Sequence, residues 1–415
     1  MLRAAFIFGL VVLVGLSGCS RGPAAIDGVV HLSMLMDMDR TGIWHELIAE
    51  FEANNPGIRV HYIEGPTSTG GREDLYVTSF LSGKNVYDLI MADTVWVVKF
   101  AAAGWLEDLT ERWPNERWAE FIPGTIEGSK YRDRIYRVPT TIDAGVLYYR
   151  TDLLQSAGEG PPQTFEALVR IAQKLQQPEQ LWGFVWQGKQ YEGLVCNFLE
   201  VLAGFGGEWV DPETNEVRLD QPEAIAALQW MRDCIHAHRI SPPGTTAYQE
   251  EEARLMFQSG RALFQRNWPY IYTLAQQEGS AVRGRVGLIP MPASAHGRSA
   301  STLGGWGFCI AKNSPHKEAA WRFVEFISAL PQVRRMQASG GSPPALKRFY
   351  EESDDPAQKA IYEVFNRTVT RPRIPQYAQA SDILQRYLSA ALTQRMTPHA
   401  AMNGAARETR LLLQR

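Results

Sequence analysis

The chain has 415 residues, of which 45% are hydrophobic and 21% are charged, and its formal net charge is −3. This length exceeds what one hydrophobic core usually supports, so we expect two lobes or domains. The small negative net charge argues against a nucleic-acid partner, which would call for a basic surface.

The N-terminus carries an export pattern. Met1-Leu2-Arg3 is a short positive start, and the apolar run 4–16 is too short to span a bilayer comfortably. Leu16-Ser17-Gly18-Cys19 resembles the bacterial lipobox, which implies cleavage before Cys19 and attachment of lipid to it. Residues 1–18 are then a lipoprotein signal peptide and 19–28 a tether, with the protein held at a membrane surface. An ordinary secretory signal with a chance cysteine is the alternative.

The exported chain would keep three further cysteines, Cys196, Cys234 and Cys309, all in apolar surroundings. An odd number leaves at least one thiol free, and we predict buried small side chains and commit to no disulfide.

The first part of the chain alternates strand and helix patterns, which predicts a mostly parallel α/β lobe. Ligands collect at the carboxyl ends of the strands in such sheets, and Asp93 lies at such an end. Strands are predicted at 29–36, 58–62 and 86–91, and helices at 44–51, 72–80 and 94–103, the first two after the loops 37–42 and 66–71.

Several crossings between two lobes are expected. The extended segment Arg137–Tyr149 makes the first, Gly304-Gly305 marks the second, and the segment 340–344 makes the third. The first lobe would contain 29–141 and 306–342, and the second 142–305 and 343–415. Such crossings form a hinge, which suits closure on a ligand.

Capping residues predict where helices of the second lobe begin. Thr164 precedes one apolar helical pattern, Asp220 with Glu223 precedes another, and Ser381 precedes a third.

Two aromatic turns are the most distinctive local feature. The apolar run Ala262–Phe264 leads to Trp268 and Tyr270, which flank a proline, and Trp306 follows two glycines. Proline fixes φ, so these rings should stand on a rigid turn at a strand end, where they suit the apolar face of a sugar. Burial in a core is the alternative.

The sequence lacks the motifs of several kinds of catalytic and metal-binding site. His236 and His238 are too close in sequence to share a helix face as metal ligands, and neither a phosphate loop nor a nucleophile elbow is present. We therefore predict no metal and no cofactor. Asp93 and Asp143 suit either the acid and base of a glycosidase or acceptors of sugar hydroxyl hydrogen bonds.

Longer motifs then carry a family resemblance. The chain reads Trp182-Gly-Phe-Val-Trp-Gln-Gly-Lys-Gln-Tyr-Glu-Gly-Leu-Val-Cys196, with related matches at 142–150, 266–270, 302–306 and Arg371-Pro372. It resembles the trehalose/maltose-binding lipoproteins of ABC importers, within the family 1 extracellular solute-binding proteins. The resemblance implies an α/β, two-lobed Venus-flytrap fold with three hinge crossings. It also implies a monomer in the periplasm or on the outer surface, which passes a disaccharide to permease subunits with an ATPase.

The resemblance further implies which residues bind the ligand. Arg72 and Asp93 would contact sugar from the first lobe, Asp143 from the hinge, and Arg371 from the C-terminal segment. Arg72 as a solvated charge, Asp93 as a helix cap and Arg371 as a lobe-closing ion pair are the alternatives. The full predicted set is Asp39, Arg72, Asp93, Asp143, Trp268, Tyr270, Gly304, Gly305, Trp306 and Arg371, with Trp96 and Tyr377 as secondary contacts.

The chain departs from the family pattern at two places. Asp37 or Asp39 takes the place of acidic residues in an Asn-Glu-rich turn, and Arg40 adds a charge. Thr141 replaces a tyrosine, which should open space beside one sugar and shift selectivity toward maltose, sucrose or glucosylglycerol. A lipid-anchored glycoside hydrolase and a sensor subunit are the rival functions.

Overall fold

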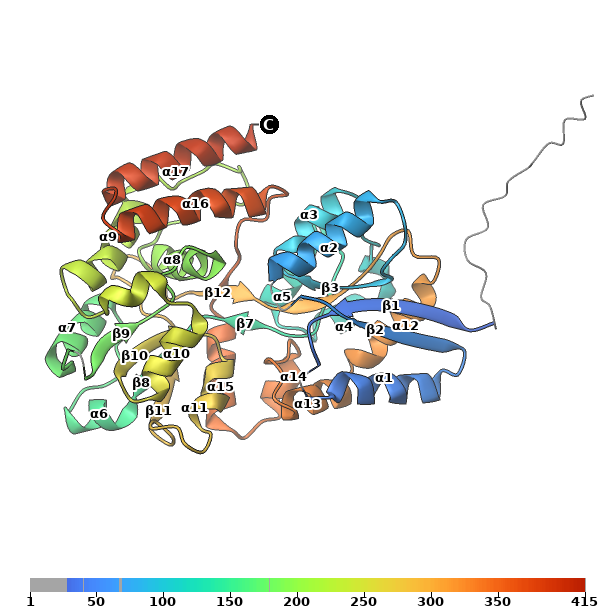
Figure 1. Cartoon of the computed structure of the whole chain (residues 1–415), viewed down its shortest axis with the longest axis horizontal. Coiled ribbons are helices and arrows are strands. Elements are labelled where there is room, and N and C mark those ends of the chain that lie inside the picture. Colours follow the sequence, from blue (N-terminus) through green and yellow to red (C-terminus); the bar gives the residue numbers. More distant parts are fainter. Residues whose placement is uncertain (1–27, 40, 67–68, 179, 415) are drawn as a thin grey trace, which may run out of the picture.

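The structure is a computed structural model that describes residues 28–39, 41–66, 69–178 and 180–414. It has two lobes of mixed helix and sheet joined by a narrow middle, with α16 and α17 on the outer side of the second lobe (Figure 1). The predicted signal peptide, Cys19 and Arg40 lie outside the described residues. Within those residues, no helix has both the length and the apolar character needed to cross a membrane.

The first lobe is built on a five-stranded sheet in the order β2-β1-β3-β13-β6. Strands β1, β2 and β3 run parallel, as predicted, whereas β13 is antiparallel to β3 and β6. Its elements are β1 (Val30–Met36), α1 (Ile43–Asn54), β2 (Ile58–Glu64), α2 (Thr69–Leu81), β3 (Leu89–Asp93), α3 (Trp96–Ala102), η1 (Thr110–Arg112), α4 (Asn115–Trp118), α5 (Pro123–Glu127), β4 (Lys130–Tyr131), β5 (Arg134–Ile135), β6 (Val138–Pro139), β13 (Trp306–Ile310), α12 (Lys317–Ile327) and α13 (Leu330–Ala338).

The second lobe is more helical and contains a four-stranded sheet in the order β11-β8-β10-β9. Its buried strand β10 ends just before Trp268, as the sequence pattern predicts. The elements are β8 (Val146–Arg150), α6 (Thr151–Ser156), α7 (Phe165–Leu175), β9 (Trp182–Val185), α8 (Glu192–Gly204), α9 (Pro222–His236), η2 (Pro243–Ala247), α10 (Glu250–Gln258), β10 (Ala262–Asn267), α11 (Tyr270–Ala275), β11 (Val286–Ile289), α14 (Lys347–Glu351), α15 (Pro356–Phe365), α16 (Tyr377–Leu392) and α17 (Pro398–Leu413).

A small sheet in the order β14-β12-β7 lies where the lobes meet, and its strands are β7 (Asp143–Ala144), β12 (Ser301–Gly304) and β14 (Thr368–Val369). The chain continues from β7 into the second lobe and from β12 into β13 of the first lobe (Figure 1). Ala345 and Leu346 still pack in the first-lobe core. The third crossing therefore lies a few residues beyond the expected position at 342.

Local predictions fail where a side chain has a stronger partner elsewhere. Thr164 caps α7 as predicted, since its hydroxyl accepts from the backbone N–H of Ala167 at 3.1 Å. Asp220 does not cap α9, because both of its oxygens bind Arg410 at 2.7 Å. Ser381 lies inside α16, which begins at Tyr377, and donates to Glu192 instead.

Two element boundaries in the first lobe also differ from the prediction. Strand β3 begins at Leu89 rather than Val86, and α2 begins at Thr69, within the segment predicted as a loop. Just before β3, the carboxylate of Asp88 accepts from the Asn85 amide at 2.8 Å and from the Ser33 N–H of β1 at 2.9 Å.

The three cysteines of the described residues are buried and free, which confirms their prediction as small core side chains. Burial raises the pKa of the Cys196 and Cys309 thiols to about 12, so these thiols stay protonated at neutral pH.

Candidate functional site

One group of predicted site residues lies at the carboxyl end of β3. Asp93 is the last residue of this strand and stands opposite Trp306, the first residue of β13. The guanidinium carbon of Arg72, from α2, lies 4.7 Å from the centre of the Trp306 ring, and Trp96 packs edge-on against that ring at 5.4 Å. The structure thus brings Arg72, Asp93 and Trp306 together, and it places Trp96 behind Trp306 in the core.

A second group lies on the hinge. Asp143 in β7 pairs with Gly304 in β12. A Cβ atom at Gly304 would lie 3.2 Å from the Asp143 Cβ and 3.9 Å from the Trp268 ring, so these three residues are close neighbours. The absence of a side chain at Gly304 keeps the space between the aspartate and the indole open.

The next residue, Gly305, has a backbone conformation that requires glycine. Its φ is +129°, and a Cβ there would lie 2.4 Å from the carbonyl oxygen of Thr141. The Thr141 hydroxyl in turn accepts from the backbone N–H of Trp306 at 3.1 Å. Thr141 therefore fixes the start of the strand that carries Trp306. The family resemblance suggests only that Thr141 lies beside the ligand.

The carboxyl group of Asp143 is the distinctive electrostatic feature of the hinge. Burial, reinforced by the nearby negative charge of Asp93, raises its pKa to about 7. Its oxygens have no hydrogen-bond donor among the described residues. Asp143 is thus an acceptor that lies beside an aromatic ring and has capacity for a hydroxyl donor.

This raised pKa makes a testable prediction about stability. The protonated form is favoured in the folded protein, so the stabilising contribution of Asp143 is complete near pH 4 and is lost as pH rises to about 7. Relative to Asp143→Asn, the wild-type protein should therefore lose stability between pH 4.5 and 8, as measured by urea unfolding of both proteins (~1 pH unit steps). A difference in stability between the two proteins that is constant with pH would contradict the assignment.

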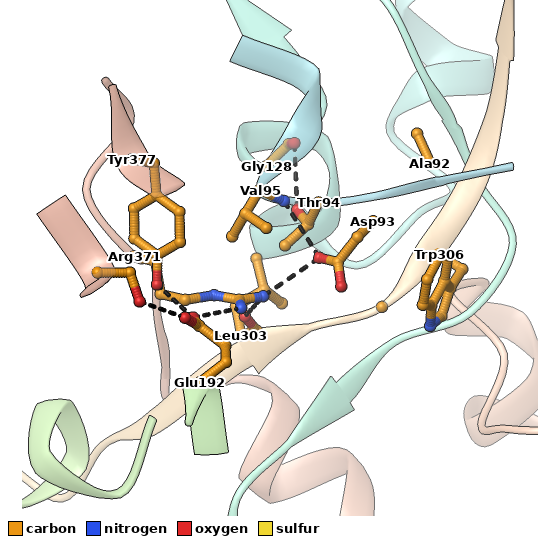
Figure 2. Close-up of polar contacts among 12 residues, drawn as sticks. Ala92, Asp93, Thr94, Val95, Gly128, Glu192, Leu303, Trp306, Arg371 and Tyr377 are labelled. Atoms are coloured by element: carbon orange, nitrogen blue, oxygen red, sulfur yellow. Dashed lines mark hydrogen bonds and ion pairs between the residues drawn. The ribbon is translucent and has the colours of Figure 1, made fainter. Parts of the chain in front are cut away.

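Arg371 connects the two lobes. Its guanidinium donates to Glu192 of the second lobe at 2.9 Å and to Asp93 of the first at 3.3 Å, as Figure 2 shows. It also reaches the carbonyl oxygen of Leu303 at 3.4 Å. The lobe-closing ion pair, an alternative to ligand binding in the sequence, is therefore present in the structure, although the same side chain borders Asp93.

Sequence reasoning missed Glu192 as a member of this group. This residue begins α8 and accepts from Arg371 and from the Tyr377 hydroxyl, as Figure 2 shows. It also accepts from the Ser381 hydroxyl. The only signal in the sequence is a carboxylate at a helix start, and many surface residues of other helices show the same feature. Its partners lie far away in the chain, so only the fold reveals them.

A buried ion pair packs against the Trp268 ring. The side chains of Glu200 and Arg266 are both fully buried, and the Arg266 Nε donates to Glu200 at 2.8 Å. The Arg266 guanidinium lies 4.2 Å from the centre of the Trp268 ring, and Glu200 also accepts from the Thr302 N–H of β12 at 3.0 Å. Burial acts to lower the pKa of Arg266, but attraction to Glu200 outweighs it and the pKa is raised.

Two predicted residues have other partners. Asp39 accepts from the backbone N–H groups of Gly42, Trp44 and His45, and from the His45 ring at 2.9 Å, so it caps α1 and has little capacity left for a ligand. Asp37, the other acidic residue of that loop, is exposed and lies 3.9 Å from Arg72, which makes it the better candidate. The hydroxyl of Tyr270 donates to Glu251 at 3.1 Å.

No cluster of three or more metal-ligating side chains occurs in the part of the chain that the structure describes. The arrangement instead offers carboxylates, guanidinium groups and indole rings on both sides of a hinge. Such a set can hold a polar ligand by hydrogen bonds and ring contacts, and it can do so from both lobes at once.

Comparisons with known proteins bear on this arrangement. A maltose-bound structure of T. maritima MalE3 is 40% identical and covers 92% of this chain and 100% of its own, with a TM-score of 0.82. A probable ABC transporter-binding protein of Deinococcus radiodurans is 32% identical, covering 85% of this chain and 86% of its own. A maltotriose-binding protein of Pyrococcus abyssi is 23% identical, covering 79% and 68% respectively.

The family model described as bacterial extracellular solute-binding protein matches residues 38–329. This match covers most of the chain, and the two-lobed fold agrees with it. The chain therefore belongs to the bacterial extracellular solute-binding protein family, as its motifs predict.

Proposed function

We propose that this protein captures a disaccharide or small α-glucoside between its lobes and delivers it to the permease of an ABC importer. Asp143 is the observation that carries the proposal, because its carboxyl group lies beside Gly304 and the Trp268 ring without a donor among the described residues, and it can accept from a sugar hydroxyl. The similarity to maltose-bound MalE3 and to a maltotriose-binding protein supports a glucoside. The ligand-binding residues proposed are Arg72, Asp93, Asp143, Trp268, Tyr270, Gly304, Gly305, Trp306 and Arg371, with Asp37 in place of Asp39.

The mechanism is closure. A ligand that contacts Asp93 and Trp306 from the first lobe and Trp268 from the second binds the closed form best, so it shifts the population toward that form. Arg371 lies at this contact, where it joins Asp93 to Glu192. The closed form is then what the permease recognises.

Calorimetric titration of the chain beginning at residue 20 tests the ligand class. We expect saturable binding of at least one of trehalose, maltose, sucrose and glucosylglycerol, with no release of glucose. Glucose release would favour the rival hydrolase that uses Asp93 and Asp143. No heat with any of these ligands would contradict the saccharide proposal while leaving the family assignment intact.

The proposed lipid anchor on Cys19 is tested separately in cells. We expect the full-length protein in the membrane fraction and Cys19→Ser outside it, because a lipidated cysteine holds the chain at the membrane. Equal distribution of the two proteins would show that Cys19 is no anchor.

A further inference from the structure

A cavity of about 660 Å³ lies between the lobes, and none of Asp143, Gly304 and Trp268 lines it. Its first-lobe wall comes from α3, α5 and β4, and its second-lobe wall from α8, the loop 207–215 and the segment 368–374. Arg371 is the only residue of the proposed saccharide site that lines it. The volume is within the range of small-molecule sites, about 300–1,000 Å³.

Two buried donors at this cavity have no acceptor among the described residues. Trp209 is 2% exposed, and its indole N–H is unpaired. Arg371 is 7% exposed, and its Nε–H is unpaired although its other nitrogens are engaged. Both side chains lie beside the Tyr377 ring, at 6.1 Å between ring centres for Trp209 and 5.9 Å from the guanidinium for Arg371. Buried donors are rarely left unpaired, so these two point to a ligand that accepts.

The charged residues that line the cavity also favour a ligand that accepts hydrogen bonds. Its acidic residues are all paired: Glu127 with Lys130 and Arg373, and Glu208 and Asp211 with Arg218. The lining residues Arg132 and Arg298, by contrast, make no ion pair within the described part of the chain. The cavity therefore has a surplus of positive charge, which favours an anion.

The rest of the lining is apolar and comes mainly from α8 and the segments around it. Leu199, Leu202, Val210 and Ile374 contribute hydrocarbon surface next to the Trp209 ring. An inorganic anion would leave this surface uncovered. A ligand with an anionic head and an apolar body would use both parts of the lining.

We propose that this cavity is a second ligand site, which binds a small organic carboxylate. The carboxylate accepts from the Trp209 indole N–H and the Arg371 Nε–H, and its apolar part contacts Leu199 and Leu202. Both lobes line the site, so its occupant also favours the closed form. The site shares Arg371 with the proposed saccharide site, but the proposal does not depend on which saccharide binds there.

The test is a titration of the full-length protein in mild detergent, in which ligand-observed NMR measures binding of the probe. Benzoate and octanoate are the probes, and benzamide is the uncharged analogue of benzoate. We expect saturable benzoate binding, at least about tenfold weaker binding of benzamide, and a similar loss in Trp209→Phe, which keeps an aromatic ring but removes the N–H donor. Trp44→Phe, in the first lobe, is the matched control and should bind benzoate as the wild type does.

Arg298→Gln keeps the test decisive if Trp209→Phe unfolds, since Arg298 is exposed. This variant should also weaken benzoate binding and leave benzamide unaffected. Absence of saturable binding, equal binding of benzoate and benzamide, or benzoate binding that neither variant changes would each overturn the proposal. The cavity would then hold water alone.

Discussion

Replacing Glu200 with glutamine is expected to lower the free energy of unfolding by about 3–5 kcal/mol, because the buried Arg266 charge would lose its counter-ion. Both side chains are fully buried, so water cannot take the place of the carboxylate. The glutamine would also meet Arg266 and the Thr302 N–H with only one acceptor oxygen, where the carboxylate offers two. Urea unfolding followed by circular dichroism measures the change.

Glu159→Gln is the matched control for this variant. Glu159 accepts from Arg170 and Lys174 at 2.9 and 2.8 Å, and the side chains of both cations are at least half exposed, so solvent can take the place of the carboxylate at each of them. Its unfolding midpoint should match that of the wild type. If the Glu200→Gln protein were as stable as the control, Arg266 would have another counter-charge. The buried ion pair would then not be what stabilises the position of Trp268.

The long-range pairs of this protein show where sequence reasoning stops. The strand that leads to Trp268, the helix capped by Thr164 and the hinge position of Asp143 all follow from local patterns of apolar residues and turn formers. The partners of Glu192 and Glu200 do not, because Arg371 and Arg266 come from distant segments that only the folded chain brings close. A local pattern contains no information about such a partner.

The two misassigned caps have the same physical cause. Asp220 and Ser381 are residue types that favour helix starts, but Arg410 and Glu192 compete for them. A charged partner provides a stronger hydrogen bond than a backbone N–H, so the tertiary contact prevails. Asp39 is the reverse case, where the family resemblance predicted a ligand contact and the local cap of α1 takes the carboxylate.

Trp268→Ala is expected to weaken saccharide binding about 30-fold or more, equivalent to about 2 kcal/mol. The ring lies beside Gly304 and Asp143, where it would cover one face of a sugar, and its own N–H already donates to Glu250 at 3.3 Å. Removal of the ring would therefore cost contact area at the centre of the site. The measurement is calorimetric titration with the saccharide that binds the wild-type protein most tightly.

Two conservative variants separate a role in binding from a role in folding. Trp268→Phe retains an aromatic face and should bind more tightly than Trp268→Ala. Trp113→Phe changes an indole that packs between Trp118 and Trp321 in the first lobe, so it should leave saccharide affinity unchanged. Wild-type affinity in Trp268→Ala would mean that the ring belongs to the core of the second lobe, the alternative that its sequence context leaves open. Arg266 beneath it would then support packing alone, and the ligand would have to be held by Trp306 and the hinge carboxylate.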